Sequence, residues 1–355
     1  MIKYLSLFSG IGAFESALRR LNIPFELINY CEIDKFASKS YSVIHNISEE
    51  KNLGDIAKIN YNKLDVNIDL TTYGFPCQDI SINGKQKGLF NDNGSLTRSG
   101  LFFEALKVIE YCKPKVAIAE NVKNLTSKKF AAQFEIVLKS LENAGYNNYW
   151  KVLNAKDYGI PQNRERVFIV SIRKDVDTEL FEFPKPYSLE KRLKDFLETD
   201  VDEKYYLNDA QIDRMSTTHF VQQKIEHRCV SKNGIIPTLI SRGYKDTKCV
   251  IIGTLKGGKW DKTYERSRRI YSENGLSPAL TTCVSGNSEV KVETNSQIRK
   301  LTPREYYRLM GFSDDEFNRA EKVNSNTQLY KQAGNSIVVD VLIEIFKSIL
   351  TQNIL

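Results

Sequence analysis

The chain has 355 residues, of which 41% are hydrophobic and 27% charged, a composition that excludes a disordered or collagen-like protein. No stretch approaches the about 20 consecutive apolar residues of a membrane helix, so we expect a cytoplasmic protein of about two domains. Six scattered cysteines without a Cys-x-x-Cys pair, and three histidines, favour neither a disulfide framework nor a metal site. The net charge of +7 indicates a polyanionic partner.

The first 185 residues alternate short apolar runs with stretches that carry apolar residues at helical spacing. This pattern is typical of an α/β fold in which helices cover a parallel sheet. Strands are expected at 4–8, 26–31, 69–74, 116–119, 149–153 and 166–172. Helices are expected at 13–21, 100–111 and 130–144. We therefore predict a first domain over residues 1–187.

The remaining sequence predicts a smaller domain and a return to the first one. Residues 188–300 contain a charged stretch and then a Gly-, Ser-, Thr- and Asn-rich region with short β-like pieces, which indicates an irregular, β-rich domain. Residues 301–323 form a hinge segment, in which a helix starts after Thr302 with Pro303 in its first turn. An apolar face in 324–355 predicts a closing helix that completes the first domain.

The turn after the first expected strand is where an α/β fold binds a nucleotide-like ligand. Gly10 and Gly12 allow close approach of the backbone, whereas Glu15 occupies the position of the third glycine of a dinucleotide fingerprint and disfavours a pyrophosphate. Glu32 has the spacing to accept hydrogen bonds from a ribose, and Asp55 from an adenine amino group. An adenosine without phosphates indicates S-adenosylmethionine; a purely structural turn is the alternative.

Reactive side chains follow two later strands and lie at the start of a third. Cys77 begins a polar, glycine-rich loop, a setting that suits a catalytic thiol better than a core cysteine. Glu120 follows the next strand, where the alternative is a helix-capping acid. Arg164 and Arg166 lie on one face of an extended segment because alternate residues point the same way; surface ion pairs are the alternative.

The basic excess is concentrated between Lys224 and Ser272, where twelve basic residues stand against four acidic ones. Interleaved aromatic residues and glycines favour a nucleic-acid surface over a solvated loop. Arg242 and one of Arg266, Arg268 or Arg269 are predicted to read bases, whereas lysines such as Lys256 and Lys259 are predicted to contact phosphates.

In this order, the motifs resemble those of the DNA (cytosine-5)-methyltransferases of bacterial restriction–modification type. The resemblance rests on Phe8-x-Gly10-x-Gly12, Glu32, Asp55, Pro76-Cys77-Gln78, Glu120-Asn121-Val122, Gln162-x-Arg164-x-Arg166, 299–305 and Gly334-Asn335-Ser336. It implies a Rossmann-like catalytic domain dependent on S-adenosylmethionine, with target recognition in 188–300. A transfer-RNA cytosine methyltransferase on the same scaffold is the alternative, but the Cys-Phe-Thr tripeptide typical of that subgroup is absent.

The resemblance also implies residue roles. Cys77 adds to carbon 6 of a flipped-out cytosine, Glu120 contacts its nitrogen 3 and amino group, Arg166 contacts its oxygen, and Arg164 supports this geometry. The cofactor-binding positions are Phe8, Gly10, Gly12, Glu32, Asp55, Ile56, Pro76, Leu101 and Asn335. The predicted DNA-binding positions are Gln78, Asn83, Lys85 and Arg98, in and after the loop that Cys77 begins, together with Arg242, Lys256, Lys259, Arg266, Arg268 and Arg269, which come from the basic window rather than from the resemblance.

The expected partner is double-stranded DNA, with no membrane or metal. The resemblance further implies a monomer in the bacterial cytoplasm and a separately encoded cognate restriction endonuclease. A serine of several relatives, which fills the space left by the flipped base, corresponds here to Asn83.

Overall fold

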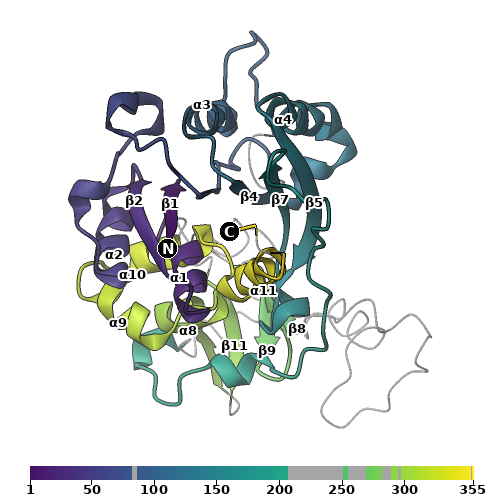
Figure 1. Cartoon of the computed structure of the whole chain (residues 1–355). Helices are drawn as coiled ribbons and strands as arrows, with labels where there is room; N and C mark the ends of the chain where they lie inside the picture. The colour runs from purple at the N-terminus through teal and green to yellow at the C-terminus, as the bar shows by residue number, and fades with distance from the viewer. Residues whose placement is uncertain are drawn as a thin grey trace.

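The computed structural model describes residues 1–81, 86–206, 251–254, 269–280, 282, 289–294, 297–352 and 354–355. Its centre is a six-stranded sheet in the order β2-β1-β3-β4-β7-β5 (Figure 1). The strands are β1 (Ile2–Leu7), β2 (Phe25–Cys31), β3 (Leu70–Tyr73), β4 (Val116–Val122), β5 (Tyr146–Asn154) and β7 (Glu165–Arg173). Each matches a strand expected from the sequence, with ends shifted by up to three residues.

Helices cover both faces of this sheet, because successive side chains of a strand point to opposite faces. In β4, Val116 and Ile118 belong to one hydrophobic core, and Ala117 and Ala119 to the other. The first core includes residues of α1 (Ala13–Arg20), α2 (Lys35–His45) and α11 (Val339–Leu350); the second includes residues of α3 (Phe102–Cys112) and α4 (Ala131–Asn143). The chain therefore folds as a three-layer α/β/α structure.

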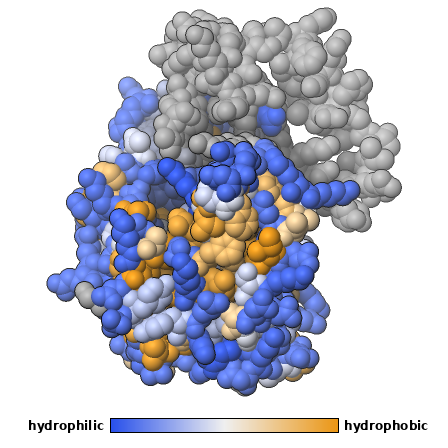
Figure 2. Space-filling view, turned by 90° about the horizontal axis from the view of Figure 1, so that it is seen from above, coloured by the Kyte–Doolittle hydropathy of each residue, from blue (hydrophilic) through white to orange (hydrophobic). Residues whose placement is uncertain are grey.

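The outer side of the α3 and α4 layer faces solvent. Figure 2 views the molecule from above, the side on which these helices lie in Figure 1, and shows a mainly hydrophilic surface with a group of hydrophobic residues near its middle. None of the helices in the described parts of the chain is long and apolar enough to cross a membrane.

One strand direction differs from the expected parallel sheet. Strands β1 to β4 are parallel, but β7 runs antiparallel to both β4 and β5. A parallel crossover needs a connection of about a dozen residues or more, usually with a helix. The connection from β5 to β7 contains only the 3₁₀ helix η7 (Ala155–Tyr158) and β6 (Gln162–Asn163). This short connection explains the antiparallel direction.

The second part of the chain is β-rich, as expected. A four-stranded sheet has the order β12-β11-β9-β8, with β8 (Ile251–Thr254), β9 (Arg269–Ser272), β11 (Lys291–Thr294) and β12 (Gln297–Lys300). The short β10 (Ser277–Pro278) pairs in parallel with β6 and joins this part to the first. The remaining 3₁₀ helices are η1 (Glu49–Lys51), η2 (Ile56–Lys58), η3 (Tyr61–Lys63), η4 (Ser99–Leu101), η5 (Lys123–Thr126), η6 (Lys128–Phe130), η8 (Leu193–Phe196) and η9 (Glu203–Tyr205).

Helices at the C-terminus return to the first part of the chain. They are α8 (Pro303–Leu309), α9 (Asp314–Glu321), α10 (Asn326–Asn335) and α11. The expected helix after Thr302 is confirmed as α8, with Pro303 in its first turn. The expected closing helix is confirmed as α11, whose Phe346 ring packs edge-to-face on Phe14 of α1 at 6.3 Å. Apolar patterning did not predict α2, α9 or α10.

Candidate active site

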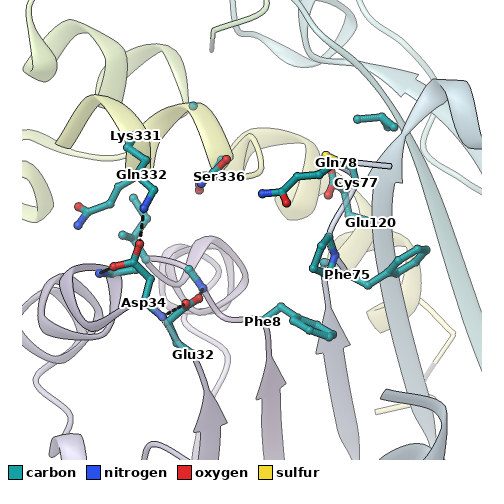
Figure 3. A pocket seen from close by; sticks show the side chains of 18 of the residues that line it. Phe8, Glu32, Asp34, Phe75, Cys77, Gln78, Glu120, Lys331, Gln332 and Ser336 are labelled. Carbon is teal, nitrogen blue, oxygen red and sulfur yellow. Dashed lines mark hydrogen bonds and ion pairs between the residues drawn. The ribbon is translucent and has the colours of Figure 1, made fainter. Parts of the chain in front are cut away.

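A cavity of about 340 Å³ opens beyond the carboxyl ends of β1 to β4 (Figure 3). Segments distant in the sequence meet there. Its lining comprises Phe8, Gly10, Ile11, Glu32, Ile33, Asp34, Ala37, Gly74, Phe75, Pro76, Cys77, Gln78, Glu120, Val122, Arg164, Arg166, Lys331, Gln332, Gly334, Asn335 and Ser336. Most of the predicted catalytic and cofactor positions therefore share one cavity.

The turn after β1 and the residue after β2 form one end of this cavity. Glu32 accepts hydrogen bonds from the backbone N–H of Gly10 at 2.9 Å and of Asp34 at 2.7 Å. Burial raises the pKa of Glu32, and these backbone hydrogen bonds oppose the increase. Phe8 and Gly10 both have positive φ, +51° and +56°, so the turn bends sharply beside Glu32.

Four predicted cofactor positions do not line the cavity as it is described. A Cβ on Gly12 would lie 2.0 Å from Nε2 of His45, so this glycine serves close packing. Asp55 accepts a hydrogen bond from the Ala57 N–H in its own turn. Ile56 is buried in the core that also contains α3, and Leu101 packs against that core.

An ion pair joins α2 to α10 at the edge of the cavity. Lys331 donates to Asp34 Oδ2 at 2.6 Å. Burial alone would raise the pKa of Asp34, but the hydrogen bond from Lys331 and those from the first N–H groups of α2 lower it overall. The sequence analysis did not identify these two residues; Asp34 had a signal, since it precedes a helix as a capping acid does.

Cys77 and Glu120 lie at the other end of the cavity (Figure 3), and Arg166 also lines the cavity. Arg166 Nε lies 2.9 Å from Glu120 Oε1. The antiparallel register pairs Arg166 with Val122, which makes Glu120 its diagonal cross-strand neighbour on the same face. This pairing brings the first residues of β7 to the end of β4 that faces the cavity.

Burial shifts the acid–base properties of this end. Burial raises the pKa of Glu120, although the positive charges of Arg166 and Arg164 oppose the increase. Burial is the main cause that raises the pKa of the Cys77 thiol, and the negative charge of Glu120 is the second. The positive charges of Arg166 and Arg164 oppose this increase. In the free protein the thiol is therefore protonated at neutral pH.

Arg164 holds the cavity wall together. It is 3% exposed and donates to the carbonyl oxygens of Leu280 at 3.2 Å, Gly334 at 3.1 Å and Ser336 at 2.6 Å. These carbonyls belong to the β-rich part of the chain and to the end of α10. Arg164 thus joins three segments at the site.

The predicted DNA-contacting residues are only partly described. Gln78 Oε1 accepts a hydrogen bond from Arg98 at 2.9 Å, so these two exposed residues lie together near Cys77. Arg269 is half-buried at the start of β9. The others lie outside the described residues: Asn83, Lys85, Arg242, Lys256, Lys259, Arg266 and Arg268.

Comparison with known proteins assigns the chain to a family. A model of C-5 cytosine-specific DNA methylases matches residues 2–351. The chain belongs to this family. The type II methyltransferase M2.ScrFI of Lactococcus lactis subsp. cremoris is 36% identical over 98% of this chain and 99% of its own. The orphan methyltransferase M.SPBetaI of Bacillus phage SPbeta is 34% identical over 98% and 97%.

Solved structures show the same fold. Entamoeba histolytica methyltransferase EhMeth aligns with a TM-score of 0.69 at 18% identity, over 99% of this chain and 98% of its own. The chain shares the Rossmann-like fold of methyltransferases that depend on S-adenosylmethionine. Because the chain belongs to the family of C-5 cytosine-specific DNA methylases, it is a DNA cytosine-5 methyltransferase. Among the described residues, no group of three or more His, Cys, Asp or Glu side chains could hold a metal ion.

Proposed function

We propose that this enzyme methylates carbon 5 of a flipped-out cytosine in double-stranded DNA with Cys77 as the nucleophile. The observation that carries the proposal is the grouping of Cys77 with the Glu120–Arg166 ion pair at one end of the cavity. Carbon 5 of cytosine is a weak nucleophile within an aromatic ring, and addition of a nucleophile at carbon 6 activates it.

In the proposed reaction, Cys77 loses its proton to water and its sulfur forms a bond to carbon 6. The electron pair of the carbon 5–carbon 6 double bond then becomes available at carbon 5, which would take the methyl group as the bond from that group to the donor's sulfur breaks and leaves its electron pair on the sulfur. A base removes the proton from carbon 5, the double bond re-forms, and the carbon–sulfur bond breaks to release the Cys77 thiolate.

Glu120 supports the addition through its proton. In the free protein Glu120 is the carboxylate partner of Arg166. Burial raises the pKa of Glu120 and so eases uptake of a proton, and the protonated carboxyl is the form that donates a hydrogen bond to nitrogen 3 of the ring and neutralises the charge that develops there. Arg166, held by Glu120 in the free protein, is placed to donate to the cytosine oxygen. Arg164 contacts carbonyl oxygens rather than the cavity's centre, so we assign it a positioning role.

We propose S-adenosylmethionine as the cofactor, held at the Glu32 end of the cavity, where it would supply the methyl group. The cations of the lining are already engaged: Lys331 with Asp34, Arg166 with Glu120, and Arg164 with carbonyl oxygens. In the described parts of the chain, Glu32 has no cationic partner within 4.0 Å. Such a lining suits ribose hydroxyl groups and a sulfonium better than a pyrophosphate.

Replacement of Glu32 tests the cofactor site. Glu32→Ala should weaken S-adenosylmethionine binding by about 1 to 3 kcal/mol, because the pocket loses a buried acceptor. Isothermal titration calorimetry measures the change. Glu26 is an exposed acid on β2, the strand that Glu32 follows, so Glu26→Ala is the matched control and should bind as the wild type does. Equal affinity of both variants would reject the site.

A mechanism-based trap tests the nucleophile. A duplex with 5-fluorocytosine at the target should leave a covalent complex that survives denaturation, because fluorine cannot leave carbon 5 as a proton does. Cys77→Ser should form no such complex while still binding DNA. A denaturation-resistant complex in the serine variant would show that another residue attacks the ring.

We also propose that residues 188–300 recognise the target sequence, with the first domain over 1–187 completed by 324–355 and a hinge at 301–323. Within the basic window, Arg242 and one of Arg266, Arg268 or Arg269 are the proposed base readers. The enzyme is proposed to act as a monomer in the bacterial cytoplasm, alongside a separately encoded endonuclease. Sequencing of chemically converted DNA from a methylation-free host that expresses the protein would identify the target.

A further inference from the structure

The turn that faces the proposed cofactor contains three left-handed residues within five positions. Phe8, Gly10 and Gly12 have φ angles of +51°, +56° and +81°. Left-handed backbone is unfavourable for a residue with a side chain, so contacts around Phe8 must maintain it. The Gly10 N–H donates to Glu32, which lines the cavity. The other end of the turn, Ile11 and Gly12, is contacted from the side away from the cavity.

His45, the last residue of α2, makes this contact with Ile11 and Gly12. Its Nε2 lies 3.0 Å from the carbonyl oxygen of Ile11, and Ile11 lines the cavity. The same ring lies directly against the α-carbon of Gly12, where any Cβ would approach Nε2 to 2.0 Å. Burial lowers the pKa of His45, so the ring is neutral at neutral pH. A neutral ring with its hydrogen on Nε2 donates to the Ile11 carbonyl.

A buried aromatic stack fixes the His45 ring. Tyr41 lies 4.9 Å from it, between ring centroids, and stacks on Tyr30 at 4.1 Å with an interplanar angle of 20°. The Tyr41 hydroxyl donates to Glu15 Oε1 at 2.8 Å. His45, Tyr41, Tyr30 and Glu15 are each no more than 1% exposed. The histidine therefore has little freedom to move away from the turn.

The same layer reaches the other side of the pocket. The Tyr30 hydroxyl and the Asn52 side-chain amide both lie 3.0 Å from the Ser38 hydroxyl. The Asn52 side chain also forms two hydrogen bonds with the backbone of Glu32: Oδ1 accepts from the Glu32 N–H at 3.0 Å, and Nδ2 donates to the Glu32 carbonyl oxygen at 2.9 Å. One buried layer thus supports both the glycine turn and Glu32.

We propose that His45 is a positioning residue for the cofactor: it holds the Ile11 carbonyl and the Gly12 backbone so that the turn has its binding conformation before the cofactor arrives. This inference rests on the proposed cofactor site. Binding then requires little rearrangement of the protein, and the preorganised turn contributes to affinity. His45 is not among the residues that line the cavity, so we assign it no contact with the reacting atoms.

Replacement of His45 by residues of two kinds tests this proposal. His45→Leu fills the same space with an apolar side chain of similar size and removes the hydrogen-bond donor to Ile11. It should raise the dissociation constant of S-adenosylmethionine about tenfold, equivalent to about 1.4 kcal/mol. At saturating cofactor its kcat should equal that of the wild type, so the loss falls on KM for the cofactor. His45→Gln places an amide N–H at the position of Nε2 and should restore most of the affinity.

Tyr41→Phe is the matched control. It removes the hydrogen bond to Glu15 but leaves the ring stack and the His45–Ile11 contact, so it should reduce thermal stability and leave cofactor affinity within twofold of the wild type. The proposal is wrong if His45→Leu binds the cofactor as well as the wild type, if His45→Gln binds no better than His45→Leu, or if Tyr41→Phe loses as much affinity. Absence of binding in the wild type would instead reject the proposed cofactor.

Discussion

At the scale of single residues, the electrostatics of the site explain why Cys77 needs its neighbours. The thiol of Cys77 is half-buried beside the Glu120 carboxyl group, and both features raise its pKa. Arg166 and Arg164 oppose this increase, but Arg166 is itself paired with Glu120 at 2.9 Å. The free enzyme therefore keeps Cys77, the proposed nucleophile, in the less reactive thiol form.

Glu120→Gln should change thiol reactivity and catalysis in opposite directions. Loss of the negative charge lowers the pKa of Cys77 and releases Arg166, so iodoacetamide should alkylate Cys77 faster at pH 8 than in the wild type, and the pH midpoint of alkylation should shift downward. Methyl transfer should become slower by about 10²- to 10⁴-fold, the usual contribution of general acid catalysis.

Mass spectrometry of the Cys77 peptide, together with single-turnover methylation, measures both effects. Glu165→Gln is a suitable control, since Glu165 is an exposed acid next to Arg166 that pairs with Lys123. Slower alkylation in Glu120→Gln would contradict the assigned effect of its charge, and an unchanged single-turnover rate would remove Glu120 from the chemistry.

At the scale of elements, the segment before α8 illustrates how a sequence motif can serve the fold. Arg299 and Glu305 are 1% and 0% exposed and form a two-point ion pair, at 2.9 and 2.6 Å. Glu305 also accepts from the N–H groups of Thr302 and Glu198, each at 2.8 Å. The carboxylate thus joins β12, the start of α8 and the chain near residue 198.

Arg299→Met should lower the free energy of unfolding by about 3 to 5 kcal/mol, because Glu305 is then a buried charge without a cation. Urea denaturation measures the loss. Lys300→Met breaks a longer, 3.4 Å pair with Glu289 and should cost no more than about 1 kcal/mol. Equal effects of the two substitutions would mean that the Arg299–Glu305 pair has no special role.

At the scale of the whole molecule, the two ends of the chain build one core and one cavity. Helix α11 packs on α1, and α10 supplies Lys331 and Asn335 to the cavity (Figure 1). The C-terminal segment is therefore part of the catalytic structure rather than an appendage to the β-rich part.

Phe346→Ala tests this shared core. The side chain is 1% exposed and contacts Phe14 across the helix pair, so truncation should cost about 3 to 5 kcal/mol of stability. Lys347→Ala, at the exposed neighbouring position, should change stability by less than about 1 kcal/mol. Circular dichroism during urea unfolding gives both values, and a loss below 1 kcal/mol in Phe346→Ala would contradict tight docking of α11.

Local sequence determined the elements and the types of residue at their ends. Short apolar runs identified the strands, and Thr302 followed by Pro303 identified the start of α8, because these signals depend only on neighbouring residues. Cys77 and Glu120 were predicted as site residues for the same reason, since each lies close to the end of a strand that the sequence indicates. The location of the cavity at strand ends followed from the α/β pattern.

The tertiary structure alone decided which side chains meet. The antiparallel direction of β7 places Arg166 beside Glu120. The short connection after β5 accounts for this direction, but the residues of β7 themselves carry no sign of it. The contacts of Arg164 with Gly334 and of Lys331 with Asp34 join residues 170 and 297 positions apart, and His45 reaches Gly12 only through the packing of α2. Such pairings depend on the path of the whole chain, because strand direction and helix packing are set by connections and by the shared core rather than by the residues that touch.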